Sequence, residues 1–251
     1  MTDDYKNRIE KLKQLIEKAD RIVFFGGAGV STESGVKDYR SEDGLYNTVR
    51  EYGVSPETIL SHSFMFGHSD VFYDFYYKYF LADKVDPNAA HYSLAKLEGQ
   101  GKLTAVITQN IDGLHQAAGS KKVFELHGTT SYHYCSECGR PFPTEEIAVL
   151  CGKVPYCKKC GGFVRPDVVM YQESLKEKTV MGAINAISNA DLLIIGGTSL
   201  AVYPAASYLG YYKGENIVLI NKGETSYDGE ATLIFREKIG QVLSDAVDLS
   251  K

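Results

Sequence analysis

Four of the five cysteines stand in two pairs with the spacing of a metal-binding site. They are Cys135 and Cys138, followed after eighteen residues by Cys157 and Cys160. Two Cys-x-x-Cys pairs supply four thiolates to one tetrahedral zinc ion, and four sulfur ligands leave no open position for water or substrate. The spacing therefore predicts structural zinc; redox dithiols and disulfides are the alternatives, and disulfides are disfavoured in a cytoplasmic chain. Cys151 is expected not to be a ligand.

Polar side chains follow two of the short apolar runs in the sequence. The segment 109–112 (Gln-Asn-Ile-Asp) comes after the run 104–108, and His127 comes after the run 123–126. Ligands of open α/β sheets bind beyond the carboxyl ends of the strands, so amides, an acid and an imidazole at these places are candidates for ligand contact. A single histidine at a strand end is more often structural, and the combination of the two groups is what favours a site.

A glycine-rich turn follows the first apolar run, 21–25. The segment 27–29 (Gly-Ala-Gly) puts small residues where a backbone can pass close to a pyrophosphate. Thr32 stands where the dinucleotide fingerprint has its third glycine, and no convincing acidic residue follows about 20 positions on, so ordinary dehydrogenase binding is disfavoured. A purely structural turn is the alternative. Small or polar residues also end later runs, at 197–199 (Gly-Thr-Ser) and at Asn221.

The elements that must position these residues follow from the apolar pattern. Apolar residues at steps of three and four predict an amphipathic helix over 3–19. The apolar runs that read as buried strands are 21–25, 104–108, 123–126, 192–195, 217–220 and 231–235. Because most of these runs are separated by helix-length or longer segments, the sequence predicts an α/β fold with a parallel sheet.

Two stretches interrupt this alternation and are predicted to be insertions. The stretch 38–88 looks largely helical, and 132–162 carries all five cysteines. In the first, seven aromatic residues fall within the nine positions 72–80. Buried packing between two lobes is the favoured interpretation of these aromatics, and an aromatic-lined ligand groove is the alternative.

The composition excludes several classes of protein. The 251 residues include 27 Lys plus Arg and 32 Asp plus Glu, a net charge of −5, which offers nucleic acid or anionic lipid no general attraction. The apolar runs are far shorter than the roughly 20 residues that span a bilayer. Residues 1–19 mix acids and bases without an apolar core, unlike a signal peptide. A cytoplasmic protein with no membrane or direct nucleic-acid partner is expected.

Taken in order, these motifs resemble the sirtuin family of NAD-dependent protein lysine deacylases over nearly the whole chain. The matching segments are 27–31, 34–36, 38–40, 108–112, 127–128, the four paired cysteines, 165–169 and 197–200. The resemblance implies a Rossmann-type parallel sheet with a small lobe made of a four-cysteine zinc ribbon and a helical module. It places the NAD-binding large domain at 1–37, 89–131 and 163–251, the helical module at 38–88 and the zinc ribbon at 132–162.

The resemblance also implies the reaction, in which the acetyl group of acetyl-lysine moves to ADP-ribose. Nicotinamide leaves, O-acetyl-ADP-ribose forms, and acetylated proteins or peptides are the partners. The implied cofactor-binding residues are Gly27, Ala28, Gly29, Thr32, Asp38, Tyr39, Arg40, Gln109, Asn110, Ile111, Asp112, His127, Gly197, Thr198, Ser199, Asn221, Lys222, Lys238 and Ile239. Asn110 and Asp112 would order the nicotinamide end, and His127 would be the base for the ribose 2′-hydroxyl, so Asn110 and His127 are the expected catalytic residues.

The segments 162–164 and 168–171 look like the strand beside which the substrate peptide lies, through main-chain hydrogen bonds, with Val169, Met170 and Tyr171 as substrate-binding residues. Where many sirtuins have Phe-Gly-Glu, this chain has Tyr171-Gln172-Glu173. Relatives that prefer succinyl-lysine or malonyl-lysine carry a Tyr-x-x-Arg pair in the helical module.

Here the matching positions of that pair are Tyr76 and Tyr79, without a guanidinium, so deacetylation is expected over desuccinylation. Two other activities could use the same motifs: transfer of ADP-ribose to a protein side chain, and non-enzymatic reading of acylated tails or of NAD. The presence of Asn110, Asp112 and His127 favours deacylation over both.

Overall fold

The computed structural model describes residues 2–36, 49–81 and 85–248. Its large sheet has six parallel strands in the order β3-β2-β1-β7-β8-β9. The strands are β1 (Ile22–Gly26), β2 (Leu103–Thr108), β3 (Val123–Glu125), β7 (Leu192–Gly196), β8 (Asn216–Ile220) and β9 (Leu233–Phe235). Each coincides with an apolar run of the sequence to within two residues, so the α/β prediction is confirmed. The strand order reverses beside β1, which is where open α/β sheets bind ligands.

Helices cover both faces of the large sheet, and this explains why its strands lack an alternating polar pattern. All five residues of β1 and of β7 are buried. The covering elements are α1 (Asp3–Lys18), α6 (Ala89–Gly99) and α10 (Ile239–Ala246) on one face, and α9 (Glu177–Ser188) and the 3₁₀ helix η4 (Ala205–Tyr211) on the other. Strands buried on both faces read as continuous apolar runs.

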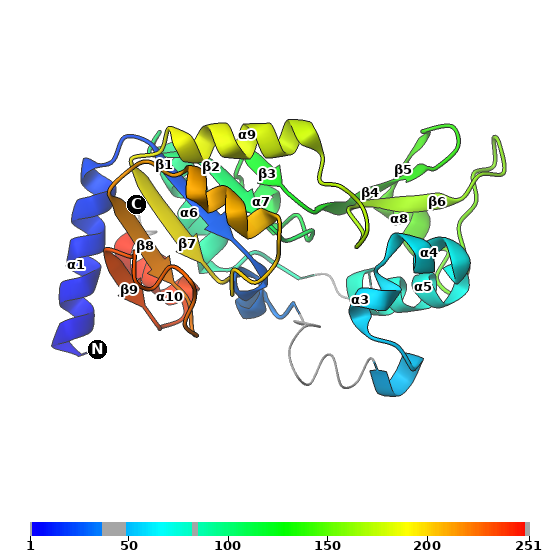
Figure 1. The fold of residues 1–251 in the computed structure, drawn as a ribbon, viewed down its shortest axis with the longest axis horizontal. Helices are drawn as coiled ribbons and strands as arrows, with labels where there is room; N and C mark the ends of the chain where they lie inside the picture. Colours follow the sequence, from blue (N-terminus) through cyan, green and yellow to red (C-terminus); the bar gives the residue numbers. More distant parts are fainter. Residues whose placement is uncertain (1, 37–48, 82–84, 249–251) are drawn as a thin grey trace.

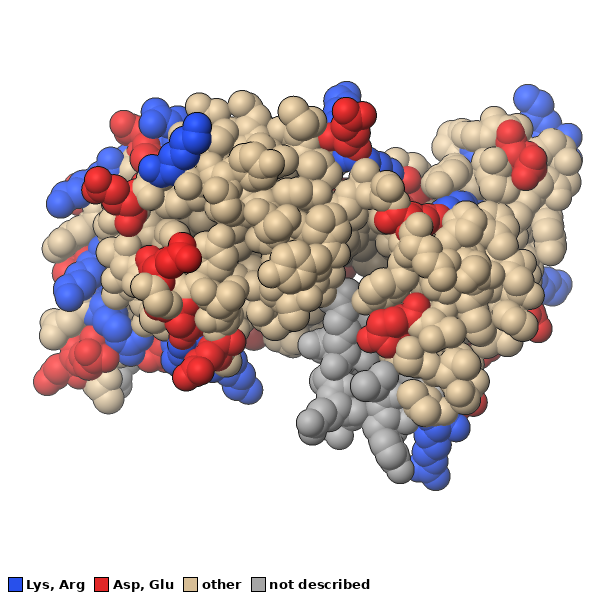
Figure 2. All heavy atoms as spheres, in the orientation of Figure 1, with Lys and Arg blue, Asp and Glu red and all other residues tan. Residues whose placement is uncertain are grey.

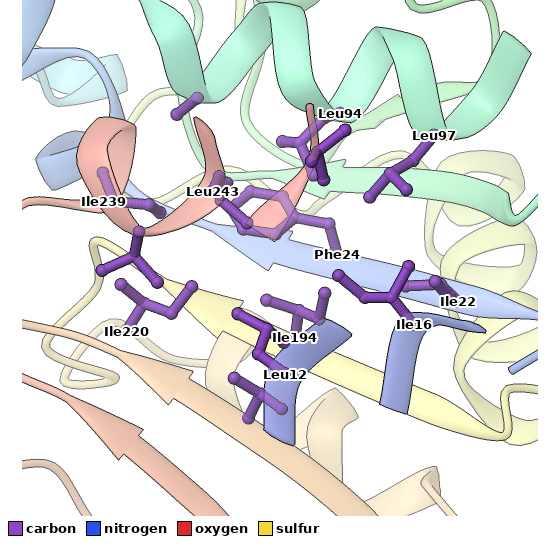
Figure 3. Close-up of a cluster of buried hydrophobic side chains, with 14 of the residues drawn as sticks. Leu12, Ile16, Ile22, Phe24, Leu94, Leu97, Ile194, Ile220, Ile239 and Leu243 are labelled. Carbon is purple, nitrogen blue, oxygen red and sulfur yellow. The ribbon is translucent and has the colours of Figure 1, made fainter. Parts of the chain in front are cut away.

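One of the two resulting cores is shown in Figure 3. Leu12 of α1, Leu94 of α6 and Leu243 of α10 point toward Phe24 of β1 and Ile194 of β7, and all five side chains are buried. The helix at 3–19 predicted from the sequence is therefore confirmed as α1, and it begins with a capping contact in which Thr2 Oγ1 accepts a hydrogen bond from Tyr5 N at 3.3 Å.

A second, antiparallel sheet with the order β5-β4-β6 lies to the right in Figure 1. Its strands are β4 (Gly128–Cys135), β5 (Pro141–Pro143) and β6 (Val164–Val168). The short helix α8 (Thr144–Ala148) follows β5. β4 starts directly after His127, so the small sheet grows out of the edge of the large one. Residues 133–135 of the predicted zinc ribbon thus pair with residues 164–166, which lie outside its predicted borders, and the domain boundaries stay a prediction.

The helical module packs against this small sheet. Its described elements are α3 (Pro56–Ile59), α4 (His62–Gly67), α5 (Ser69–Tyr76) and the π-helical turn η3 (Tyr77–Leu81). Of the seven clustered aromatics, Phe72, Tyr73, Phe75, Tyr76 and Tyr77 are buried, and Tyr79 and Phe80 are half-buried. They share an apolar cluster with Val164, Val168 and Met170. Packing therefore accounts for most of these aromatics, as favoured from the sequence.

The surface has the mixed charge that the composition predicts. On the face that Figure 2 shows, positive and negative side chains of the described residues are interspersed around the large lobe. In the part of the chain that the structure describes, no helix is both long and apolar enough to cross a membrane. The cytoplasmic location and the absence of nucleic-acid partners stay predictions.

Two buried histidines lie behind the carboxyl edge of the large sheet. His115, in the short helix α7 (Leu114–Ala117), is 1% exposed, and neither of its ring nitrogens has a hydrogen-bond partner among the described residues. Its ring centroid lies 4.7 Å from that of His91 in α6. Burial, with a smaller contribution from His91, lowers the pKa of His115 to about 3, and burial also lowers the pKa of His91. Both rings therefore fold in the neutral form.

We expect the free energy of unfolding to fall as the pH is lowered from 7 to 5. The folded pKa of His115 lies below the unfolded value of about 6.5, so in this range the unfolded chain binds a proton that the folded chain excludes. His115 alone accounts for a loss of about 2 kcal/mol between pH 7 and pH 5. Urea unfolding of the zinc-loaded chain at both pH values measures it.

A variant pair isolates this contribution from any other acid-sensitive group. His115→Leu should reduce the difference between the two pH values by about 2 kcal/mol, whereas His68→Ala, at an exposed histidine, should leave it unchanged. The same pH difference in His115→Leu as in the unmodified chain would contradict the assignment.

Candidate functional site

A cleft of about 590 Å³ lies where the carboxyl edge of the large sheet faces the small lobe. Nine of the residues predicted from the sequence line it: Ala28, Gln109, Asn110, Ile111, Asp112, His127, Val169, Met170 and Tyr171. The volume is within the range of small-molecule sites. Tyr76, Tyr79 and Phe80 also line it, so part of the aromatic cluster does face a ligand-sized cavity, which was the alternative interpretation.

Three strand ends bring the polar residues of the cleft together. Ala28 opens the 3₁₀ turn η1 (Ala28–Val30) after β1, Gln109 follows β2, and His127 follows β3. Hydrogen bonds continue the sheet beyond its strands, from Gln109 N to Gly26 O at 3.0 Å and from Leu126 N to Thr108 O at 2.9 Å. The three strand ends are thereby held side by side, as the sequence predicted.

A buried serine links the two polar residues that follow β2. Asn110 Nδ2 donates to Ser31 Oγ at 2.9 Å, and Ser31 Oγ donates to Asp112 Oδ2 at 2.6 Å. Asp112 Oδ1 in turn accepts a hydrogen bond from Leu114 N at 3.0 Å. Ser31, which is 1% exposed, therefore fixes both side chains. It belongs to the glycine-rich motif, but nothing in the sequence indicated that it joins the two.

The ring of His127 is oriented by a main-chain carbonyl. Its Nδ1 lies 2.9 Å from Gln109 O. A carbonyl oxygen can only accept, so Nδ1 carries the proton of the neutral ring and Nε2 is its basic nitrogen. The main chain of His127 also contacts the predicted substrate segment, since His127 O accepts a hydrogen bond from Val169 N at 2.8 Å.

Close contact between two loops explains why glycines are needed in the first turn. Gly29 N donates to Gly197 O at 2.8 Å, and a Cβ at position 29 would lie 2.8 Å from the Cα of Gly197. Gly197 itself has a φ of +59°. Gly27, Gly29 and Gly197 do not line the cleft as described, whereas Ala28 does. Close approach of two loops thus accounts for these glycines, and their contact with a diphosphate stays a prediction.

The remaining predicted cofactor residues lie around this edge or beyond the described chain. Thr198 Oγ1 accepts a hydrogen bond from Gln109 Nε2 at 3.1 Å, which ties the end of β7 to that of β2. The side chain of Ile239 is 4% exposed and belongs to the core (Figure 3), so only its main chain could meet a ligand. Thr32, Ser199, Asn221, Lys222 and Lys238 do not line the described cleft. Asp38, Tyr39 and Arg40 fall outside the described residues.

The predicted substrate segment lies in the cleft wall, but its main chain is largely occupied. Tyr171 N donates to Leu60 O and Tyr171 O accepts from His62 N, both at 3.0 Å. β6 is paired with β4. The helical module therefore already holds both main-chain groups of Tyr171, and contact of a peptide with the predicted segment stays a prediction. Among the main-chain hydrogen bonds between described residues, none involves Val169 O or Gln172 N.

Two further groups of residues at the cleft were not found from the sequence. Val202, Tyr203 and Pro204 also line the cleft, and no sequence pattern distinguishes them from an ordinary loop. Behind the segment, Arg165 Nη2 donates to Glu173 Oε2 at 2.8 Å. Although burial opposes it, the hydrogen bond from Arg165 lowers the pKa of Glu173 to about 2, so this ion pair holds the segment over the whole working range of pH.

The four paired cysteines converge on one point between β4 and the loop before β6. All four Sγ atoms lie within 4.8 Å of one another, with Cys135 and Cys160 at 3.5 Å and Cys138 and Cys157 at 3.9 Å. Tetrahedral zinc with Zn–S bonds of about 2.3 Å requires S–S separations of about 3.8 Å. Hydrogen bonds from backbone amides, first that of Lys159, lower the pKa of Cys157 to about 7.

These distances fit one structural zinc ion, as predicted. Cys151 lies outside the group, which confirms that it is not a ligand.

Comparison with known proteins gives consistent matches along the chain. The Sir2 family matches residues 27–204. A Clostridium acetobutylicum protein named NAD-dependent protein deacetylase is 51% identical over 241 residues, covering 96% of this chain and 98% of the relative. A Staphylococcus aureus protein of the same name is 42% identical over 238 residues, covering 95% and 97%. A solved structure described as Sir2 with a p53 peptide and NAD+ is 36% identical, with a TM-score of 0.83 and coverage of 94% and 95%.

Proposed function

Since this chain belongs to the Sir2 family, we propose that its cleft removes acetyl groups from lysine side chains of proteins with NAD as co-substrate. One observation carries the proposal. Asn110 and Asp112 of the motif 108–112 and His127 of the motif 127–128 border the same cavity as the segment at Val169 and Tyr171. A pyridine nucleotide and an acetylated side chain would thus meet beside an imidazole.

Bound NAD supplies a bond from C1′ of its ribose to nicotinamide, which must break as the acetyl oxygen approaches. The protein's part in that step is positioning. We assign the nicotinamide end to Asn110 and Asp112, whose side chains are fixed through Ser31. The Val169 carbonyl oxygen, which has no partner among the described residues, is suited to accept a hydrogen bond from the Nε–H group of the acetylated lysine.

The step that follows needs a base near neutral pH. We assign this role to Nε2 of His127, which would take the proton of the ribose 2′-hydroxyl, while Gln109 O holds Nδ1–H and so keeps the required tautomer. The main chain at Tyr171 is already paired, so we propose that the peptide adds as a strand between the segments 172–175 and 202–204, which both contribute residues to the cleft lining.

An assay of three products tests the function. The purified chain is incubated with an acetyl-lysine peptide, with and without NAD, and mass spectrometry follows the peptide, nicotinamide and O-acetyl-ADP-ribose. NAD-dependent formation of all three products in equal amounts is expected. Nicotinamide release without deacetylation would indicate ADP-ribosyl transfer or NAD hydrolysis instead, and the absence of turnover would favour a non-enzymatic reader.

The same assay should show that succinyl-lysine is a poor substrate. Among the described residues that line the cleft, the one lysine or arginine is Lys78, and its ammonium group is paired with Glu51 and lies 5.4 Å from the centre of the Tyr79 ring. A carboxylate at the end of the acyl chain would lose its hydration on entering the cleft, and no unpaired cationic side chain among the described lining residues would compensate for that loss. We expect kcat/KM for a succinyl peptide to be lower by about tenfold or more.

A butyryl peptide of the same sequence is the control for size. It has no charge, so it should be used at a rate closer to that of the acetyl peptide. Equal rates for acetyl and succinyl peptides would contradict the prediction.

A further inference from the structure

Gln172 has a backbone conformation that is uncommon for any residue except glycine. Its φ is +76°, and the one other non-glycine residue of the described chain with a positive φ is Leu200, at +57°. This region crowds the Cβ atom of an L-residue, so surrounding contacts must hold it. Gln172 lines the cleft, and Leu200 stands two residues before Val202, which also lines it. Strained backbone in two segments that border one cleft indicates a functional constraint.

The side chain of Gln172 holds the first turn of α4. Its Oε1 accepts a hydrogen bond from Ser63 N at 3.0 Å. Because α4 begins at His62, the N–H group of Ser63 has no acceptor within the helix. The side chain therefore satisfies an otherwise unpaired donor of the helical module.

Three more hydrogen bonds join the same two segments, 60–63 and 171–173, which together we call the clamp. They run from Tyr171 N to Leu60 O at 3.0 Å, from His62 N to Tyr171 O at 3.0 Å, and between His62 Nδ1 and Glu173 Oε1 at 2.8 Å. The clamp connects parts of the chain about one hundred residues apart.

The wall that the clamp holds is thin. Tyr171 and Gln172 line the cleft on one side and, on the other, a second groove bordered by residues such as Glu57, Ser63 and His68. A wall with open space on both sides is not fixed by close packing. Its position therefore depends on the hydrogen bonds of the clamp together with the ion pair between Arg165 and Glu173.

We propose that Gln172 is a positioning residue for the acetylated peptide, acting through its hydrogen bond to Ser63 N. This inference rests on the proposed function, since it takes the cleft as the peptide site. The bond fixes the backbone at 172, and with it the N–H group of Gln172, to which no described residue is hydrogen-bonded and where the peptide main chain is proposed to pair. Without the bond, the backbone at 172 is less ordered in the free protein. Peptide binding must then restrict it, and the conformational entropy lost in doing so lowers peptide affinity.

Peptide binding without turnover tests this directly. The zinc-loaded full chain is titrated into a fluorescently labelled acetyl-lysine peptide, and anisotropy gives the dissociation constant. Q172A and Q172G both lack the acceptor and should both weaken binding by about fivefold. Hydrogen exchange at Ser63 N–H should become faster in both variants, and the KM for NAD should stay within about twofold of the unmodified value.

Two matched variants serve as controls. Q172E keeps an acceptor at the same distance and should restore most of the peptide affinity and the protection of Ser63 N–H. S63A keeps the main-chain donor and should bind the peptide as the unmodified chain does. Glycine adopts a positive φ without strain, so Q172G can be used to measure peptide affinity if Q172A fails to fold.

Unchanged peptide affinity or unchanged exchange at Ser63 in Q172A and Q172G would overturn the proposal. Failure of the proposed function would look different, because the unmodified chain would then form no O-acetyl-ADP-ribose from NAD and acetyl peptide, whatever the variants bind.

Discussion

Replacing His127 with alanine is expected to abolish deacetylation while the fold and the zinc content stay unchanged. The proposed step that needs a base is removal of the proton from the ribose 2′-hydroxyl, and His127 is the imidazole that lines the cleft in the described chain. General-base catalysis contributes about 10²–10⁴-fold to rate. We therefore expect kcat to fall by at least about a hundredfold, measured by the mass-spectrometric assay of all three products.

Release of nicotinamide, which precedes the step that needs a base, provides a second test of this prediction. Loss of nicotinamide needs positioned groups, not a base, so His127→Ala should still exchange labelled nicotinamide into NAD when acetyl peptide is present. His68→Ala, at an exposed histidine of the helical module, is the control and should keep full deacetylation. A His127→Ala variant with undiminished deacetylation, or a folded one that loses the exchange, would refute the assignment of the base.

The features predicted from the sequence are those that neighbouring residues determine. Each strand of the large sheet is a short apolar run because it is buried on both faces, and the run ends where polar residues meet the cleft. The four zinc ligands were recognisable because two Cys-x-x-Cys pairs constrain the geometry locally. The polar residues could be placed together since parallel strands that are neighbours in a sheet end at the same edge.

The features that the sequence did not predict depend on contacts between distant parts of the chain. The sequence around Tyr171 is typical of a strand that could pair with a peptide. Only the folded chain shows that Leu60 and His62 already bind both main-chain groups of Tyr171. In the same way, Gly29 matches a phosphate-binding turn by its position, whereas its close neighbour is Gly197. Such pairings arise from packing of whole elements and carry no local signature.

Removal of zinc should unfold the small lobe and stop deacetylation. Structural zinc bound by cysteines contributes about 10–16 kcal/mol of apparent binding free energy at neutral pH, comparable to the whole stability of an ordinary domain, about 5–15 kcal/mol. β4 carries Cys135 at its end and follows His127 directly at its start, so loss of this strand also removes support from the catalytic ring. Cys138→Ser is expected to lose the ion, measured as zinc per chain by mass spectrometry, together with activity.

The fifth cysteine provides a control within the same lobe. Cys151 is exposed and lies outside the group of four, so Cys151→Ser should keep one zinc per chain, the thermal transition and full activity. Because the large sheet has cores of its own, Cys138→Ser should retain the circular dichroism of the large lobe while the small lobe becomes sensitive to proteases. Retention of zinc and activity in Cys138→Ser, or loss of zinc in Cys151→Ser, would show that the sulfur positions do not define the metal site.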